Sequence, residues 1–306
     1  MAQVVASVVP FDTLASANAR SRRIVDRIAT GGLWTAAGSV VALLALFIGY
    51  VFYKGVSVIS WHFLVGYPSA ANVGGGIGPE IFNSFYILIL TLAFTLPIAV
   101  SAGMYLQEYA GPGRFRDLVQ FSAESLATVP SIVMGLFGLL IFVETFHWHF
   151  TALGGALTLT LLNLPAMMRV TQEALSSVPG TYREASMALG ATRWQTVVKV
   201  ILPSAIGPLI TGVVLVSGRI FGETAALIYT AGASVSYGKS AYDFNPFHTA
   251  ETLAVHLYST HREALVPDAD AIGNGSALVL LVMVLLFNVV ARVVGRQLTI
   301  RFTGKA

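Results

Sequence analysis

The sequence contains no cysteine and few charged residues. The lack of cysteine excludes disulfides, thiol nucleophiles and cysteine-type zinc sites. Charged residues account for 11% of the 306 positions, whereas a soluble domain carries roughly 25%. Hydrophobic residues account for 55%, and the mean hydropathy is +0.74. A soluble core of this size could not bury that much apolar surface, but a bilayer accepts it, so the composition indicates an integral membrane protein.

Signatures of several other function classes are also missing. The net charge is +3, but the basic residues are spread among apolar runs and form no stripe, which excludes a nucleic-acid partner. Neither His-Glu-x-x-His nor Gly-x-Ser-x-Gly occurs, so no enzyme machinery is visible. The segment Gly232–Ser240 resembles a phosphate-binding loop. However, five residues separate its glycines instead of four, so we expect no nucleotide site here.

The histidines do not form a convincing ligand set in the sequence. His147 and His149 flank a tryptophan in a short turn between two apolar runs, where polar and aromatic residues are typical of a membrane interface. His248, His256 and His261 have no spacing that indicates a metal site. We therefore expect no metal in this chain.

Six uncharged runs of 19 or more residues divide the chain. They are Ile28–Tyr53, Ile81–Gln107, Ser125–Val143, Thr145–Met168, Val200–Gly218 and Ala271–Ala291. Each is about long enough to cross a hydrocarbon core of roughly 30 Å as a helix. The runs lack the alternation over about ten residues that a transmembrane barrel needs. The sequence therefore predicts an all-α integral membrane protein with six transmembrane helices, the fifth of which continues to about Ala231.

The distribution of lysine and arginine orients these helices. With the N-terminus inside, fourteen of the 18 basic residues lie in cytoplasmic segments, and Lys54, Lys239 and Arg262 lie outside. This excess is the positive-inside signal, so both termini are expected in the cytoplasm. The first run exceeds the apolar part of a signal peptide, about 7–15 residues, and is expected to be a retained helix. In the long external loop, a short helix is expected within His248–Leu265.

The cytoplasmic segment 177–203 carries two signals for the start of a helix. Thr181–Glu184 and Thr192–Gln195 both have capping-box spacing, in which the first side chain and the fourth satisfy each other's backbone amides. Between them, Gly190 favours the left-handed conformation that ends a helix. The second helix is expected to run to Pro203. A loop that only joined two spans would not need two capped helices, so a docking hairpin is predicted; an unpartnered surface hairpin is the alternative.

Residues Glu184-Ala185-Ser186, Gly190 and Val200-Ile201-Leu202-Pro203 resemble the EAA loop of ABC importer permeases. The family pattern is Glu-Ala-Ala, three residues, Gly, nine residues and Ile-x-Leu-Pro; Ser186 and Val200 depart from it. In that family the loop docks into a groove on a cytoplasmic ATPase. The resemblance implies an ATPase-coupling loop that contains Thr181, Glu184, Ala185, Ser186, Gly190, Thr192, Leu202 and Pro203.

Two further stretches, Val129–Phe137 and Gly218–Ala226, resemble the phosphate-specific (Pst) permeases. The Gly-Glu-Thr-Ala sequence in the second stretch and the loop Gly74-Gly75-Gly76 are similar to the A-type subunit of that system. The resemblance covers about residues 74–295. It implies a type I ABC importer permease fold and a subunit of an ATP-driven phosphate importer in the bacterial inner membrane.

The resemblance also implies partners: a paired C-type permease subunit, an ATPase dimer, an external phosphate-binding protein and the lipid bilayer. No cofactor is expected in this chain, because ATP and Mg²⁺ would bind to the ATPase. The expected layout is a cytoplasmic tail over 1–27, a first transmembrane helix with an external loop over 28–73, a permease core over 74–295 with the coupling loop at 177–203, and a cytoplasmic tail over 296–306. A permease for another oxyanion or polar solute remains an alternative. An ion-driven secondary transporter is less favoured, because it has no ATPase to dock.

Arg219 and Glu223 are the main charges inside the predicted spans. At i,i+4 they share one helix face and are expected to pair. An unpaired arginine at the bilayer centre costs roughly 2.5–3.5 kcal/mol on insertion scales, which favours pairing. The pair either lines the path of an oxyanion or only fastens helices to one another. The planar guanidinium fork suits phosphate. The candidates for the translocation pathway are Arg219, Glu223, Thr224, Ser131, Arg169 and Glu173, with an interfacial anchor as the alternative role for the last two.

Small residues and prolines in these spans have structural explanations. Gly218 and Gly222 form a small-xxx-small step that is expected to serve close helix packing. Pro130 is expected to kink the third span and expose the Ser131 hydroxyl, and Gly135 is expected to serve packing.

Overall fold

The computed structural model describes residues 11–69, 73–234, 241–263 and 267–303, and every regular element within these ranges is helical. The chain divides into two compact units, Met1–Tyr53 and Lys54–Ala306. The all-α class predicted from the sequence is thereby confirmed.

The first unit is built on one long helix, α1 (Phe11–Gly55). The candidate membrane span Val25–Val58 has a mean hydropathy of 2.1 in its most apolar window, and no residue of that window is buried. Large apolar side chains without a protein neighbour in their own unit are suited to lipid. Since α1 begins at Phe11, part of the region expected as a tail over 1–27 is helical.

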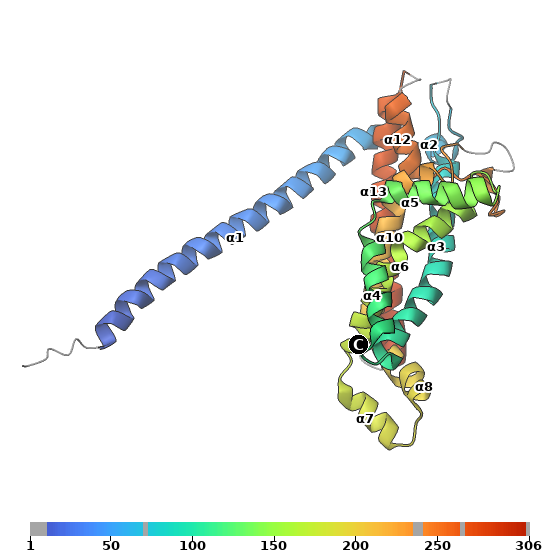
Figure 1. Cartoon of the computed structure of the whole chain (residues 1–306). Coiled ribbons are helices and arrows are strands. Elements are labelled where there is room, and N and C mark those ends of the chain that lie inside the picture. Colours follow the sequence, from blue (N-terminus) through green and yellow to red (C-terminus); the bar gives the residue numbers. More distant parts are fainter. Residues whose placement is uncertain (1–10, 70–72, 235–240, 264–266, 304–306) are drawn as a thin grey trace, which may run out of the picture. The chain divides into compact units, whose positions relative to one another are not determined.

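The second unit is a helical bundle (Figure 1). Its elements are η1 (Val56–Val58), α2 (Trp61–Val65), α3 (Gly78–Met104), η2 (Tyr105–Tyr109), α4 (Arg114–Ala127), α5 (Ser131–Gly138), η3 (Leu139–Thr145), α6 (Ala152–Ser176), α7 (Gly180–Ala188), α8 (Arg193–Thr196), η4 (Val197–Ile201), α9 (Leu202–Ser204), α10 (Ile206–Gly222), α11 (Ala225–Ile228), α12 (Leu253–Glu263) and α13 (Ala269–Thr303). Helices α7 and α8 lie at one end of this unit, and α2 and α12 lie at the opposite end (Figure 1).

Glycines allow the central helices to pack closely. A Cβ added at Gly103 of α3 would lie 2.7 Å from the Cβ of Thr171 on α6. A Cβ at Gly212 of α10 would run into the Val170 side chain on the same helix, α6. Both positions therefore require a residue without a side chain for these backbones to approach, as in many membrane helix pairs.

Four helices are long and apolar enough to cross a membrane by themselves, and six spans result if each of two bent pairs counts as one. The single helices are α1, α3, α6 and α13. The bent pairs are α4 with α5–η3, at 101°, and α8–α9 with α10, at 66°. Each of the six predicted runs overlaps one of these spans.

Pro130 causes a larger distortion than the predicted kink. It takes the N-cap position of α5 with φ −58° and ψ 141°, an extended conformation, and it has no N–H to continue the helical ladder. The third span is consequently broken between α4 and α5, which run in clearly different directions (Figure 1).

The boundaries of two predicted spans are wrong. Helix α6 begins at Ala152 instead of Thr145, because extended Thr151 caps it and accepts a 3.0 Å hydrogen bond from the Gly154 amide. It then continues through its charged residues to Ser176. Helix α10 ends at Gly222 and does not continue to Ala231.

The long loop before α13 contains the expected helix, and the C-terminal region is more helical than expected. The short helix expected within His248–Leu265 is present as α12, Leu253–Glu263. The glycine-lysine-serine part of the rejected phosphate-binding loop, 238–240, lies outside the described residues. Helix α13 runs to Thr303, so most of the tail expected over 296–306 is helical.

The orientation predicts which positions are accessible from each side of the membrane. The chain has no cysteine, so a single introduced cysteine is a unique label. We expect Phe244→Cys, at a 71% exposed position, to react with a membrane-impermeant maleimide in intact spheroplasts. We expect Arg114→Cys, at an exposed position in a segment predicted to be cytoplasmic, to react only after permeabilisation. Labelling of both positions from the same side would contradict the orientation.

Candidate coupling and translocation sites

The hairpin of α7 and α8 begins differently from the prediction. Pro179 takes the N-cap position of α7 with φ −54° and ψ 137°, and no side chain caps this end. Thr181 therefore lies inside the first turn, where its hydroxyl cannot cap the helix, and the first predicted capping box is wrong. Thr181, Glu184 and Ala185 are instead exposed on α7.

The turn between the two helices matches the prediction. Gly190 has φ +85°, and its amide donates to the Met187 carbonyl at 2.9 Å. The next amide, of Ala191, donates to the Ser186 carbonyl at 3.2 Å, which completes a Schellman motif. The left-handed stop at Gly190 is thus confirmed.

The second capping box is also confirmed. The Thr192 hydroxyl accepts from the Gln195 amide at 3.3 Å, and the Gln195 side chain accepts from the Thr192 amide at 2.9 Å. The helix continues through the π-helical turn η4 to Leu202 and Pro203 in α9. The chain then bends by 66° into α10.

Ser186, which departs from the EAA pattern, bridges the two helices of the hairpin. Its hydroxyl lies 2.9 Å from that of Thr196, and Thr196 is buried. An alanine at position 186 could not make this bond. Serine in place of alanine therefore adds a hydrogen bond between the two helices, of the kind worth about 1 kcal/mol.

A charged clamp that the sequence did not reveal fastens the hairpin to the bundle. Nη2 of Arg183 donates to Oε1 of Glu108 at 2.6 Å and to the Leu175 carbonyl at 2.8 Å. Nη1 donates to the Val178 carbonyl at 2.9 Å. The Glu108 side chain is 8% exposed, and its hydrogen bond raises the pKa of the Arg183 guanidinium. In the sequence Arg183 counts only as a positive-inside charge, because Glu108 lies 75 positions away.

Four large apolar side chains are exposed on the hairpin. The exposed fraction is 45% for Tyr182, 46% for Met187, 89% for Leu189 and 61% for Trp194. Exposed apolar groups on a projecting, rigidly held element are characteristic of a protein interaction site.

The predicted ion pair between Arg219 and Glu223 does not form. Because α10 ends at Gly222, Glu223 adopts an extended conformation with ψ 123°, and the i,i+4 geometry is lost. Its Oε1 accepts a 3.3 Å hydrogen bond from the Ala226 amide. Arg219 is exposed and makes no hydrogen bond or ion pair within the described part of the chain.

Arg219 lies on a face of α10 that the described residues of the second unit leave uncovered. A Cβ at Gly218 or Gly222 would meet no atom within 4 Å, and Leu215 on the same face is 70% exposed. Within the described part of the second unit, no helix therefore meets the expected packing role of Gly218 and Gly222. The guanidinium stands beside a strip of small residues with open space around it.

The two stretches that resemble Pst permeases pack against each other. A Cβ at Gly135 of α5 would lie 2.8 Å from the Cα of Ala226 on α11, so a glycine at this position allows the two helices to approach closely. Ser131 begins α5 and is half-buried, and the Thr224 hydroxyl lies 3.4 Å from the Gly222 carbonyl. The structure thus brings the broken third span next to the segment that follows Arg219.

Arg169 and Glu173 form a separate charged site on α6. Nε of Arg169 donates to Oε1 of Glu173 at 3.1 Å, and the side chains are 77% and 65% exposed. Both line a groove of about 490 Å³ between α4 and α6, which Glu124 also borders. A pair this exposed contributes little to stability.

Comparisons with known proteins identify the family. A family model described as "Binding-protein-dependent transport system inner membrane component" matches residues 96–303, which include the hairpin and the open face of α10. The "Probable ABC transporter permease protein YqgI" of Bacillus subtilis (strain 168) is 44% identical over 293 residues, covering 93% of this chain and 99% of the relative. The "Phosphate transport system permease protein PstA" of Xylella fastidiosa (strain 9a5c) is 34% identical over 218 residues, covering 71% of this chain and 74% of the relative.

Solved structures share the fold at low sequence identity. The permease-like chain in "Crystal structure of bacterial alginate ABC transporter in complex with alginate pentasaccharide-bound periplasmic protein" has a TM-score of 0.62 at 16% identity, with 92% of this chain and 96% of that chain covered. A chain of the MetNI methionine ABC transporter in an inward-facing conformation has a TM-score of 0.58 at 19% identity, with 72% and 94% covered.

The fold and these matches define a multi-pass membrane permease subunit of an ABC importer, not an enzyme. The chain belongs to the family of binding-protein-dependent transport system inner membrane components.

Proposed function

We propose that this permease is the A-type membrane subunit of an ATP-driven phosphate importer in the bacterial inner membrane. Relatives named as phosphate transport permeases support the substrate, at 34% identity over 71% of the chain. The observation that carries the proposal is the free guanidinium of Arg219 on the open face of α10. A planar fork of N–H donors binds a phosphate oxyanion in bidentate fashion, and here no carboxylate of the described chain neutralises it.

The open face of α10 also supports a paired subunit. A permease that forms half of a pathway needs a helix face that can meet the paired subunit. The strip of Leu215, Gly218, Arg219 and Gly222 is left free by the described residues of the second unit. We assign this strip, together with Ser131 and Thr224, to the pathway shared with a C-type permease. Arg169 and Glu173, in their groove between α4 and α6, are assigned to the inner end of that pathway.

The exposed apolar side chains of the hairpin support docking to a cytoplasmic ATPase. Tyr182, Leu189 and Trp194 would enter a groove on that subunit. The Arg183 clamp would then transmit movements of the ATPase to η2, which continues α3, and to α6. ATP and Mg²⁺ would bind in the ATPase dimer. An external phosphate-binding protein would deliver the ion to the opposite end of the bundle.

The alternative is import of another oxyanion, because the 44% identical relative is named only as a probable ABC transporter permease. Competition distinguishes the two. We expect cells that lack other phosphate importers to take up labelled phosphate only when they express this chain with its partners. Excess unlabelled phosphate or arsenate should suppress the uptake, whereas sulfate and molybdate should not. Uptake of sulfate or molybdate in place of phosphate would establish the alternative.

A further inference from the structure

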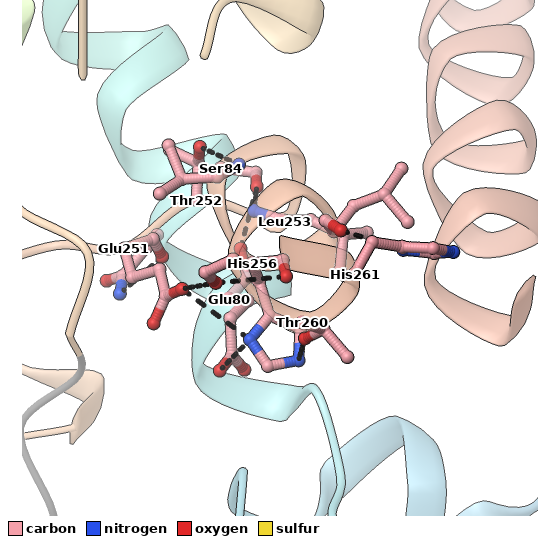
Figure 2. Close-up of polar contacts among 12 residues, drawn as sticks. Glu80, Ser84, Glu251, Thr252, Leu253, His256, Thr260 and His261 are labelled. Atoms are coloured by element: carbon pink, nitrogen blue, oxygen red, sulfur yellow. Dashed lines mark hydrogen bonds and ion pairs between the residues drawn. The ribbon is translucent and has the colours of Figure 1, made fainter. Parts of the chain in front are cut away.

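Three ionisable side chains meet at the end of the bundle opposite the hairpin (Figure 2). Glu80 comes from the first turn of α3, Glu251 from the residues just before α12, and His256 from α12 itself. Nδ1 of His256 lies 3.6 Å from Oε1 of Glu80 and 3.6 Å from Oε1 of Glu251. One nitrogen or oxygen atom from each residue lies within 4.8 Å of the other two.

Glu80 is unusual in its burial. The residue has no exposed surface, and neither of its carboxylate oxygens accepts a hydrogen bond from any described residue. The side chains of Glu251 and His256 are 6% and 11% exposed. Within the described ranges no lysine or arginine pairs with either carboxylate. Two buried carboxylates thus face a single imidazole, an excess of negative charge that is costly without a cation.

We propose that Glu80, Glu251 and His256 bind a divalent transition-metal ion, for which Zn²⁺ is the best match. Two carboxylates and a neutral imidazole balance the charge of one such ion. Zn²⁺ binds oxygen and imidazole nitrogen at about 2.0–2.2 Å, which in a tetrahedral site places ligand atoms about 3.3 Å apart. The observed 3.6 Å separations are close to this value and longer than the roughly 2.7–3.2 Å of a direct N–H···O bond.

Neighbouring groups hold these ligands in place. The Thr260 hydroxyl lies 3.4 Å from Nε2 of His256, a contact that leaves Nδ1 available to an ion. The Ser259 hydroxyl donates to Oε1 of Glu251 at 3.0 Å. Such outer contacts orient ligands at metal sites and tune the affinity for the metal.

The backbones that carry the ligands are tied together directly. The Asn83 side chain donates to the Glu251 carbonyl at 3.1 Å, and the Ser84 hydroxyl accepts from the Leu253 amide at 2.9 Å (Figure 2). The approach of α3 to α12 is therefore built into the fold, and an ion would add a third tie between them.

The donor set also selects the class of ion. Mg²⁺ and Ca²⁺ prefer six or more oxygen ligands, whereas this site offers one nitrogen and a small number of oxygens. Imidazole together with carboxylate suits Zn²⁺ and its first-row neighbours.

A proton on His256 is the alternative to a metal ion at this site. Burial lowers the pKa of His256, but the carboxylates of Glu251 and Glu80 outweigh this effect and raise it.

The test uses the full-length chain, purified with its partner subunits through a tag that contains no histidine. After EDTA treatment and incubation with Zn²⁺, we expect about one zinc per chain to survive gel filtration, measured by mass spectrometry. Zinc should raise the unfolding temperature of the complex, whereas excess Mg²⁺ should not. Glu251→Gln and His256→Gln should weaken zinc binding by at least about tenfold. The matched control is His261→Gln, which removes an exposed imidazole from the same helix and should bind zinc like the parent.

Zinc K-edge absorption of the parent complex reports the metal ligands directly, without a substitution that could cause misfolding. The expected first shell has one imidazole and otherwise oxygen. Three results would each overturn the proposal: no zinc retained above background by the parent, a first shell with several imidazoles, or unchanged binding by assembled His256→Gln. The first of these would leave a protonated His256 between the two carboxylates.

Discussion

Replacing Arg219 with glutamine is expected to reduce phosphate uptake by about tenfold to a hundredfold, the range that corresponds to losing hydrogen bonds to a charged group worth about 1.5–3 kcal/mol. Assembly should be unaffected, because Arg219 makes no contact that holds the described fold together. Arg219→Lys should recover part of the activity, since it keeps the charge but loses the planar fork. The measurement is labelled phosphate uptake per assembled complex.

Two comparisons separate a pathway role from a structural one. Arg114→Gln removes an exposed arginine from the first residue of α4 and should leave uptake unchanged. Glu223→Gln combined with Arg219→Gln should be as inactive as Arg219→Gln alone, because the two side chains form no pair. Recovery of uptake in the double variant would show that Arg219 only balances Glu223.

Loss of the Arg183 clamp is the second change with a large expected effect. Arg183→Ala strands the buried carboxylate of Glu108 and frees two backbone carbonyls of the α6–α7 connection. Removing one partner of a pair at this partly exposed site is expected to cost about 2 kcal/mol, below the roughly 3–5 kcal/mol of a fully buried pair. We expect the hairpin to lose its fixed orientation, so phosphate uptake should fall by more than the amount of assembled complex does.

The readout for this change is ATP hydrolysis measured together with uptake in the same preparation. An uncoupled complex should hydrolyse ATP without responding to substrate. Lys199→Ala removes an exposed cation from the turn η4 without breaking a clamp and serves as the control. Uptake and substrate-stimulated hydrolysis that both stay at parental levels in Arg183→Ala would contradict a role for the clamp in coupling.

Local signals in the sequence predicted local structure well where no neighbour competed. The Thr192 capping box and the stop at Gly190 are both present because each needs only residues within a few positions. The Thr181 box fails for an equally local reason: Pro179 already supplies the extended residue that precedes the helix. Charge counting placed six spans but misplaced the start of α6, because hydropathy does not register the Thr151 cap.

Contacts between distant segments could not be predicted in this way. Arg183 and Glu108 lie 75 positions apart. Glu80 and Glu251 are separated in the sequence by most of the helices of the bundle. Hydropathy marks Glu80 only as the boundary of an apolar run. The pairing of Arg219 with Glu223 was expected from helical spacing and was wrong, since spacing does not indicate that α10 ends at Gly222.

Transport by reconstituted proteoliposomes is the sharpest test of whether this permease moves phosphate inward at the expense of ATP. The vesicles would contain the purified complex, with ATP enclosed on the ATPase side and the binding protein with labelled phosphate on the other. We expect accumulation of phosphate that requires both ATP and the binding protein and that Arg219→Gln lowers by about tenfold to a hundredfold. Phosphate entry that is independent of ATP, or ATP-driven entry of a different oxyanion with none of phosphate, would contradict it.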